Sequence, residues 1–137
     1  MREILFRGKR VDTGEWVEGY LYCLSEKHNP FIMAKNKCGE SHEVIPHTVG
    51  QYTGLTDKSG NKIFEGDIVD VLYDIKYTGV AAKRIGLFKV VFYKGCFMKD
   101  KITKINDEKG LFHFIPSDVC TVIGNIHDNP ELLGGAE

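Results

Sequence analysis

The sequence has no long apolar run, and no stretch approaches the ~20 residues that a membrane-spanning helix requires. Its four cysteines are widely separated and include no C-x-x-C pair, so we expect reduced thiols, with Cys96 and Cys120 as small core residues. The opening residues Met1–Arg7 are charged and too short in apolar length for a signal peptide. These absences predict a cytoplasmic protein that does not associate with membranes.

The motifs of common enzyme classes are also missing. No G-x-x-x-x-G-K-[ST] phosphate loop and no G-x-S-x-G nucleophile turn occurs. The run Ser41-His42-Glu43 has the residue types of a catalytic triad, but adjacency in sequence does not give triad geometry. The spacing of Cys38, His42 and His47 matches no zinc pattern. We predict that the protein is not an enzyme and has no catalytic residues, cofactor or metal site.

Charge is distributed unevenly along the chain, although the net charge is only -1. Residues 76–109 carry nine Lys and Arg against three Asp and Glu, whereas residues 110–137 carry four acidic side chains and no Lys or Arg. Lysines beside aromatic rings can form a groove for single-stranded nucleic acid. The competing interpretation, which we favour, places these lysines on solvated strand faces. Nucleic-acid binding by residues 76–109, through Lys89, Lys99 and Lys101, is therefore the alternative function.

Turn residues recur every few positions, and short runs rich in Val, Ile, Tyr and Phe lie between them. This pattern predicts a mainly β protein with short helical turns only. The pair Gly66-Asp67 before a β-branched run is a common entry to the first long strand of a small barrel. We expect β hairpins over about residues 1–50, packed on an SH3-like barrel over residues 51–133, with a frayed tail at residues 134–137.

The clearest hairpin pairs Arg2–Arg7 with Trp16–Leu24 across a turn at Asp12–Glu15. Both faces of its second strand carry apolar side chains, so we expect this strand to be covered on both sides. A small two-layer domain needs less apolar surface than this, and interface cores favour aromatic residues. We predict self-association through this N-terminal surface, with Trp16 and Tyr20 as anchors.

Polar and aromatic residues also cluster just before the tight turn at Asp57–Gly60. Gln51, Tyr52 and Thr53 would either form a recognition surface or join the two subdomains through hydrogen bonds to the backbone. We favour the structural role, and Gln51 and Tyr52 remain candidate interaction residues.

Three blocks of the sequence together carry a family resemblance: Met1–Arg10 with Gly14–Gly19, Thr48–Gly60 with Ile63–Val69, and Val122–Leu133. They resemble, in order and over nearly the whole chain, the YopX family of phage and prophage proteins. The resemblance implies one YopX-like domain in a phage-encoded protein that acts in a bacterial cytoplasm and forms homo-oligomers. It implies no catalytic mechanism.

These observations lead to one functional hypothesis. The chain is a non-enzymatic phage or prophage accessory protein that acts as a protein-interaction or self-assembling module. The sequence does not identify its macromolecular partner.

Overall fold

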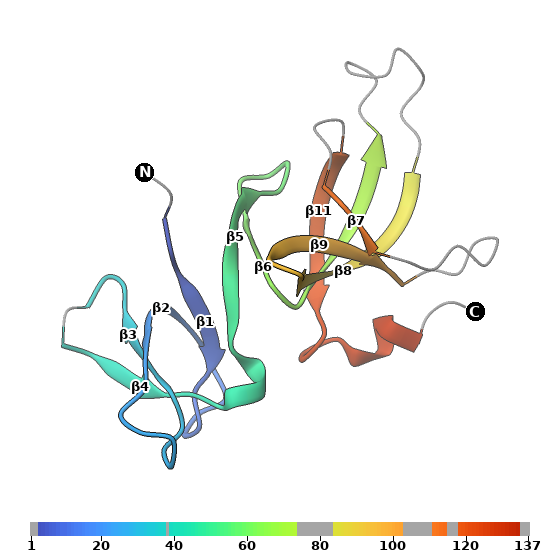
Figure 1. Cartoon of the computed structure of the whole chain (residues 1–137). Coiled ribbons are helices and arrows are strands. Elements are labelled where there is room, and N and C mark those ends of the chain that lie inside the picture. Colours follow the sequence, from blue (N-terminus) through green and yellow to red (C-terminus); the bar gives the residue numbers. More distant parts are fainter. Residues whose placement is uncertain (1–2, 38, 74–83, 103–110, 115–117, 135–137) are drawn as a thin grey trace. The chain divides into compact units, whose positions relative to one another are not determined.

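The computed structural model describes residues 3–37, 39–73, 84–102, 111–114 and 118–134 (Figure 1). The protein is mainly β, and helical residues in the described part of the chain occur only in two short 3-10 turns. The chain divides into two compact units, Met1–Gly54 and Leu55–Glu137, which we call the N-terminal and C-terminal units.

The first sheet has six strands in the order β4-β3-β2-β1-β5-β6, and β5 runs across the boundary between the units. Its elements in chain order, with the connecting 3-10 turn η1, are β1 Phe6–Lys9, β2 Trp16–Tyr22, β3 Phe31–Ala34, β4 Ser41–Glu43, η1 Pro46–Thr48, β5 Gly50–Thr56 and β6 Lys62–Phe64. The predicted pairing of the first two strands is present, but β1 lies further along the chain than expected. The turn after Lys9, with Gly14 at a φ of 74°, sets a register in which Lys9 lies opposite Trp16.

The second sheet lies in the C-terminal unit and has the order β10-β9-β8-β7-β11. Its elements, with the 3-10 turn η2, are β7 Asp67–Tyr73, β8 Arg84–Tyr93, β9 Cys96–Lys101, β10 Leu111–Phe112, β11 Asp118–Asn125 and η2 Pro130–Gly134. Both sheets are antiparallel. The pairings of the described strands give an open order that ends at β10 and β11, so the SH3-like barrel is not confirmed.

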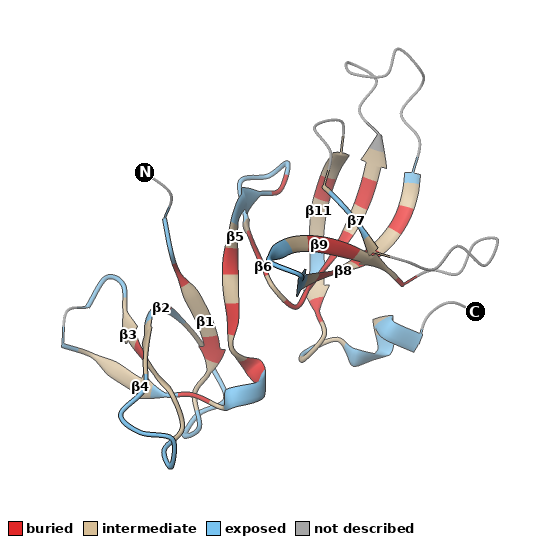
Figure 2. Ribbon diagram, in the orientation of Figure 1, coloured by how far each residue is buried: buried red, intermediate tan, exposed pale blue. Residues whose placement is uncertain are grey.

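The main hydrophobic core belongs to the C-terminal unit, where buried residues recur along β7, β8 and β11 (Figure 2). Alternate residues of these strands point to one inner face, because side chains alternate along a strand. The buried residues of this hydrophobic core are Ile63, Val69, Val71, Phe88, Val90 and Cys120. The N-terminal unit has a thinner core, in which Leu5, Ile32 and Val44 are fully buried.

The end of β4 returns to β1 and curls the N-terminal sheet. Arg10 and Val44 form an isolated bridge, and the Ile45 amide donates to the Lys9 carbonyl at 2.9 Å. A Cβ atom at Gly8 would lie 3.0 Å from the Cβ of Val44, so the face of β1 that carries Gly8 is the inner face. Trp16 and Tyr20 lie on the opposite face of β2, which we call the outer face.

Replacing Gly19 by alanine is expected to destabilise the protein by about 2 kcal/mol or more. An added Cβ would lie 1.9 Å from the carbonyl oxygen of Met33 on the neighbouring strand, so backbone must shift. Urea unfolding measures the effect, and Gly134→Ala is the control because nothing lies within 4 Å of a Cβ there. Equal stability of the two variants would contradict this close packing of β2 and β3.

Candidate interaction surfaces

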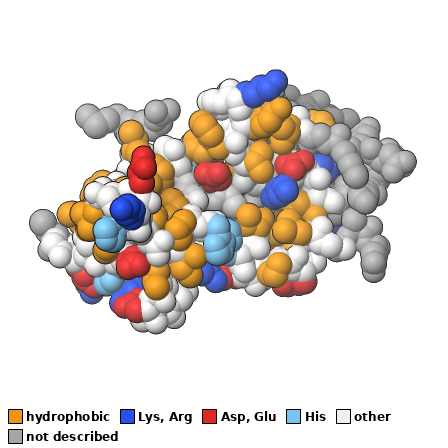
Figure 3. All heavy atoms as spheres, turned by 60° about the horizontal axis from the view of Figure 1, so that its bottom comes forward, with side chains coloured by type: hydrophobic (Ala, Val, Ile, Leu, Met, Phe, Trp, Pro, Cys, Tyr) orange, Lys and Arg blue, Asp and Glu red, His pale blue; other side chains and the backbone are white. Residues whose placement is uncertain are grey.

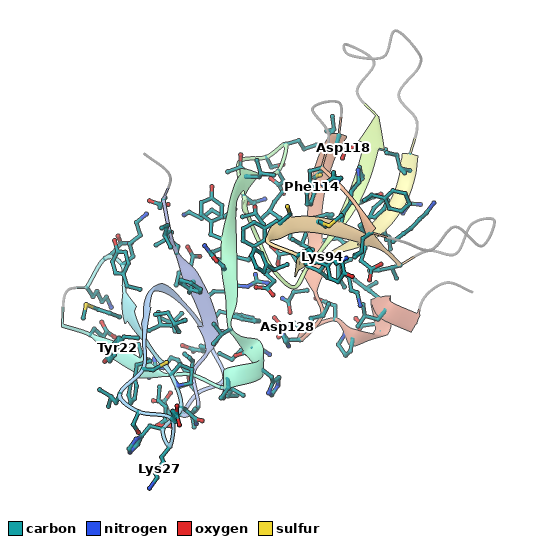
Figure 4. All side chains as sticks on the ribbon, in the orientation of Figure 1. Tyr22, Lys27, Lys94, Phe114, Asp118 and Asp128 are labelled. Carbon is teal, nitrogen blue, oxygen red and sulfur yellow. The ribbon has the colours of Figure 1, made fainter. Side chains whose placement is uncertain are left out.

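Aromatic side chains gather on the outer face of the N-terminal sheet. Cross-strand pairing places Tyr20 beside Met33 and Tyr22 beside Phe31. The ring of Tyr22, which is labelled in Figure 4, stacks on that of Phe31 with centroids 5.5 Å apart. Tyr20 is 51% exposed. We call these four residues and Trp16 the outer aromatic face. Exposed apolar surface of this kind marks contact sites in proteins.

Trp16, one of the two predicted anchors, is half-buried against two cations. The guanidinium carbon of Arg7 lies 4.7 Å from its ring centroid, and the ammonium of Lys9 lies 5.4 Å away. A cation over the ring is attracted to its negative π face, so both contacts stabilise this position of Trp16. The geometry therefore favours Tyr20 as the anchor, with Trp16 bordering it.

The candidates on β5 occupy positions inside the fold. Tyr52 is only 9% exposed, and its amide donates to the Leu5 carbonyl at 2.8 Å. Gln51 is half-buried opposite Phe6 on β1. Both contacts lie within the N-terminal unit, and Tyr52 belongs to its core. Side-chain hydrogen bonds from these residues that join the two subdomains stay a prediction.

The candidate lysines do not converge on one surface. Lys99 is 5% exposed, and its ammonium pairs with the carboxylate of Asp118 on β11. Lys101 shares its face of β9 and is half-buried. Lys89 lies opposite Asp100, on the other face of the sheet, and its ammonium is 3.5 Å from that carboxylate. The phosphate-tracking groove that would need all three lysines together is not formed by their described positions.

Sequence reasoning missed the buried pair between Lys99 and Asp118. The ammonium of Lys99 lies 5.3 Å from the ring centroid of Phe88 and 5.9 Å from that of Phe114. Figure 4 labels Phe114 and Asp118. Strands β9 and β11 are separated by β8 and β7 in the sheet order, so this contact requires the sheet to curl strongly toward its inner face. The signal in the sequence was the two-residue turn Lys94-Gly95, because a turn of that length sets the register that places Lys99 opposite the core residue Val90.

The two cysteines that were expected in the core have different environments. Cys120 is buried, and burial together with the negative charge of Asp118 raises the pKa of its thiol to about 11. This thiol is therefore protonated and unreactive near neutral pH. Cys96 is exposed, so its predicted core position is wrong. It directly follows a two-residue turn, at the end of β9 that lies beyond the core.

The central sequence block builds a turn that covers one edge of the second sheet. The carboxylate of Asp57 accepts hydrogen bonds from the amides of Ser59 and Asn61 and from the side chain of Asn61. It also accepts from the Val122 amide of β11 at 3.1 Å, and the Lys58 amide donates to the Cys120 carbonyl at 3.0 Å. Burial alone would raise the pKa of Asp57, but these hydrogen bonds outweigh it and lower the pKa.

The closing sequence block forms a second local network. The side-chain oxygen of Asn125 accepts from the amides of His127 and Asp128, and that of Asn129 accepts from the Asn125 amide. A Cβ at Gly124 would lie 2.4 Å from the Asn129 oxygen, so the turn needs glycine there. The polar residues of both blocks therefore build the fold.

The remaining candidates assemble no further site. In the part of the chain that the structure describes, no three His, Cys, Asp or Glu side chains gather in a way that would hold a metal ion. His42 contacts Glu40 at 3.0 Å, His47 is exposed, and Cys38 lies outside the described residues. Among the described residues, no helix has the length and hydropathy needed to cross a membrane.

The chain is similar to proteins of known structure. The crystal structure of protein EF1440 from Enterococcus faecalis is 28% identical in sequence, with a TM-score of 0.55 over 97% of this chain and 99% of that chain. No curated protein matches. A family model described as YopX protein matches residues 5–134, as the three sequence blocks predicted. The chain therefore belongs to the YopX family.

Proposed function

We propose that this YopX-family chain is a non-enzymatic phage or prophage accessory protein of the bacterial cytoplasm that assembles with itself. The contact is the outer aromatic face of the N-terminal unit. The observation that carries the proposal is the half-exposed Tyr20, set among Trp16, the stacked rings of Tyr22 and Phe31, and Met33.

The thin core of the N-terminal unit supports this proposal. Units of this size bury a small fraction of their apolar surface and are marginally stable by themselves. Here three apolar side chains are fully buried, while the aromatic residues of β2 and β3 lie on the outer face. Hydrophobic side chains reach the molecular surface in several places (Figure 3). Burying the outer aromatic face against a second copy would extend the core, and Tyr and Trp are enriched at such contacts.

The test is the variant Tyr20→Glu. We expect the native chain to form oligomers and the variant to associate about tenfold or more weakly, because a charge replaces a central aromatic anchor. Sedimentation equilibrium over a concentration series measures this. Val11→Glu is the matched control, since Val11 is 49% exposed in the turn between β1 and β2. A native chain that is monomeric throughout the series would refute the proposal.

Nucleic-acid binding, the alternative function, has less support from the described residues. Lys99 is buried against Asp118, and Lys89 lies beside Asp100. A lysine that is already paired with a carboxylate displaces few counterions from a phosphate, and the release of those counterions drives the binding of nucleic acid.

A further inference from the structure

Strand β5 is anchored in both units of the chain. At its beginning, Gln51 lies opposite Phe6 on β1 of the N-terminal unit. The Tyr52 amide donates to the Leu5 carbonyl of the same unit at 2.8 Å. The far end of β5 leads into the turn at Asp57, which hydrogen bonds fasten to β11 of the C-terminal unit. The two ends of one strand are therefore held by different units.

Gly54 lies between these two anchors and interrupts the strand. Its φ of 86° is left-handed, whereas antiparallel strands have φ near about −140°. A left-handed glycine of this kind bends a strand locally and disrupts its pairing. The boundary between the two units falls directly after Gly54. The bend in β5 and the boundary of the units therefore coincide.

The residues around Gly54 are held less tightly than the beginning of β5. Buried positions give way to exposed ones along the strand, and Gly54, Leu55 and Thr56 are all exposed (Figure 2). Nothing lies within 4 Å of a Cβ atom built at Gly54. Few buried contacts and an exposed backbone are typical of the segments that move most readily.

Glycine suits a pivot at this position, because it adopts positive and negative φ about equally well. Each unit also has a core of its own. Leu5, Ile32 and Val44 are fully buried in the N-terminal unit, and the main core surrounds Phe88 in the C-terminal unit. Units with separate cores can move as bodies when a few connecting residues absorb the changes in φ and ψ.

We propose that Gly54 is a hinge about which the N-terminal unit turns relative to the C-terminal unit. The outer aromatic face lies on the N-terminal unit, so this motion changes the direction in which the face points while both cores stay intact. The hinge does not depend on self-association, and it operates whether or not the chain forms oligomers.

Distances between two spin labels on the full-length chain, measured by double electron–electron resonance, test the hinge. Two exposed thiols carry the labels, Cys23 in the N-terminal unit and Cys96 in the C-terminal unit. Cys120 is buried and stays unlabelled, and Cys38→Ser removes the fourth thiol. Labelled chains are diluted with an excess of unlabelled chains, so that the measured pairs lie within one chain.

We expect the distribution of distances between Cys23 and Cys96 to be about twice as wide as that of a pair inside one unit, or wider. The reference pair is Cys23 with Val11→Cys, in chains that carry Cys96→Ser. Val11 is exposed and belongs to the same unit as Cys23, so the width of this reference comes from the labels and their turns alone. Equal widths of the two distributions would overturn the hinge.

Gly54→Val tests whether the motion is located at this residue. Valine is β-branched and disfavours a positive φ, so this variant should narrow the distribution between Cys23 and Cys96 by about half. Gly14→Val is the matched control. Gly14 has a φ of 74° and also has nothing within 4 Å of a Cβ, but it lies in a turn inside the N-terminal unit. This control should leave the width unchanged.

Two outcomes would overturn the assignment to Gly54. Either Gly54→Val leaves the width unchanged, or Gly14→Val narrows the distribution equally. If Gly54→Val does not fold, Gly54→Ala and Gly14→Ala provide the same comparison, because alanine also disfavours a positive φ but adds a single methyl group.

Discussion

Replacing Lys99 by methionine is expected to destabilise the protein by about 3–5 kcal/mol. The side chains of Lys99 and Asp118 are 6% and 2% exposed, so the substitution leaves a carboxylate in the core without the ammonium beside it. The rings of Phe88 and Phe114 also lie beside that ammonium, so the carboxylate would be left next to apolar groups. Urea unfolding of the purified variant measures the loss.

The double variant Lys99→Met/Asp118→Leu should recover most of that stability. Apolar residues of similar volume replace buried ion pairs with little cost, since the desolvation of both charges is then avoided. Lys89→Met is the control, because the Lys89–Asp100 pair is about one-third exposed and is worth less than about 1 kcal/mol. If the losses of unfolding free energy in Lys99→Met and in Asp118→Leu simply added in the double variant, the ion pair would not be the source of the effect.

The buried pair also explains where the sequence interpretation stopped. Alternation along a strand assigns polar residues to the solvent, so Lys99 was assigned to a surface with Lys101. Only the register of β9 on β8 reveals that Lys99 lies opposite Val90, on the core face. Its partner Asp118 is nineteen residues further along the chain, and three strand pairings separate β9 from β11. The alternation of residues along one strand does not show which residue of a distant strand will lie beside Lys99.

Elements dictated by local chemistry were predicted more fully. Glycine turns and β-branched runs predict a mainly β chain, and the Trp16 strand was placed close to its observed bounds. Cys96 was misplaced because an apolar neighbourhood in sequence does not show where the core ends along a hairpin.

The outer aromatic face contains both predicted anchors, but the cations that cover Trp16 come from β1. Their contact depends on a register that the turn after Lys9 sets.

Asp57→Asn is expected to cost about 3 kcal/mol near neutral pH. One carboxylate oxygen accepts from the Ser59 and Asn61 amides, and the other accepts from the Asn61 side chain and the Val122 amide. An amide keeps the first pair of hydrogen bonds but directs its own NH2 group toward the second pair of donors. The contact to Val122 is lost, and with it part of the cover on the edge of β11.

The pH dependence distinguishes this explanation from a general packing defect. The pKa of Asp57 is lowered in the folded protein, so the carboxylate contributes its stability above its ordinary pKa of 3.8 and loses it as pH falls through the folded pKa. The native chain and Asp57→Asn should therefore converge in unfolding free energy under acid conditions. Urea titrations at neutral pH and at about pH 3 compare the unfolding free energies of the two chains.

Asp12→Asn is the control, because Asp12 pairs with Arg10 at the exposed surface. A stability difference for Asp57→Asn that stays constant with pH would show that charge on Asp57 does not hold the turn against β11.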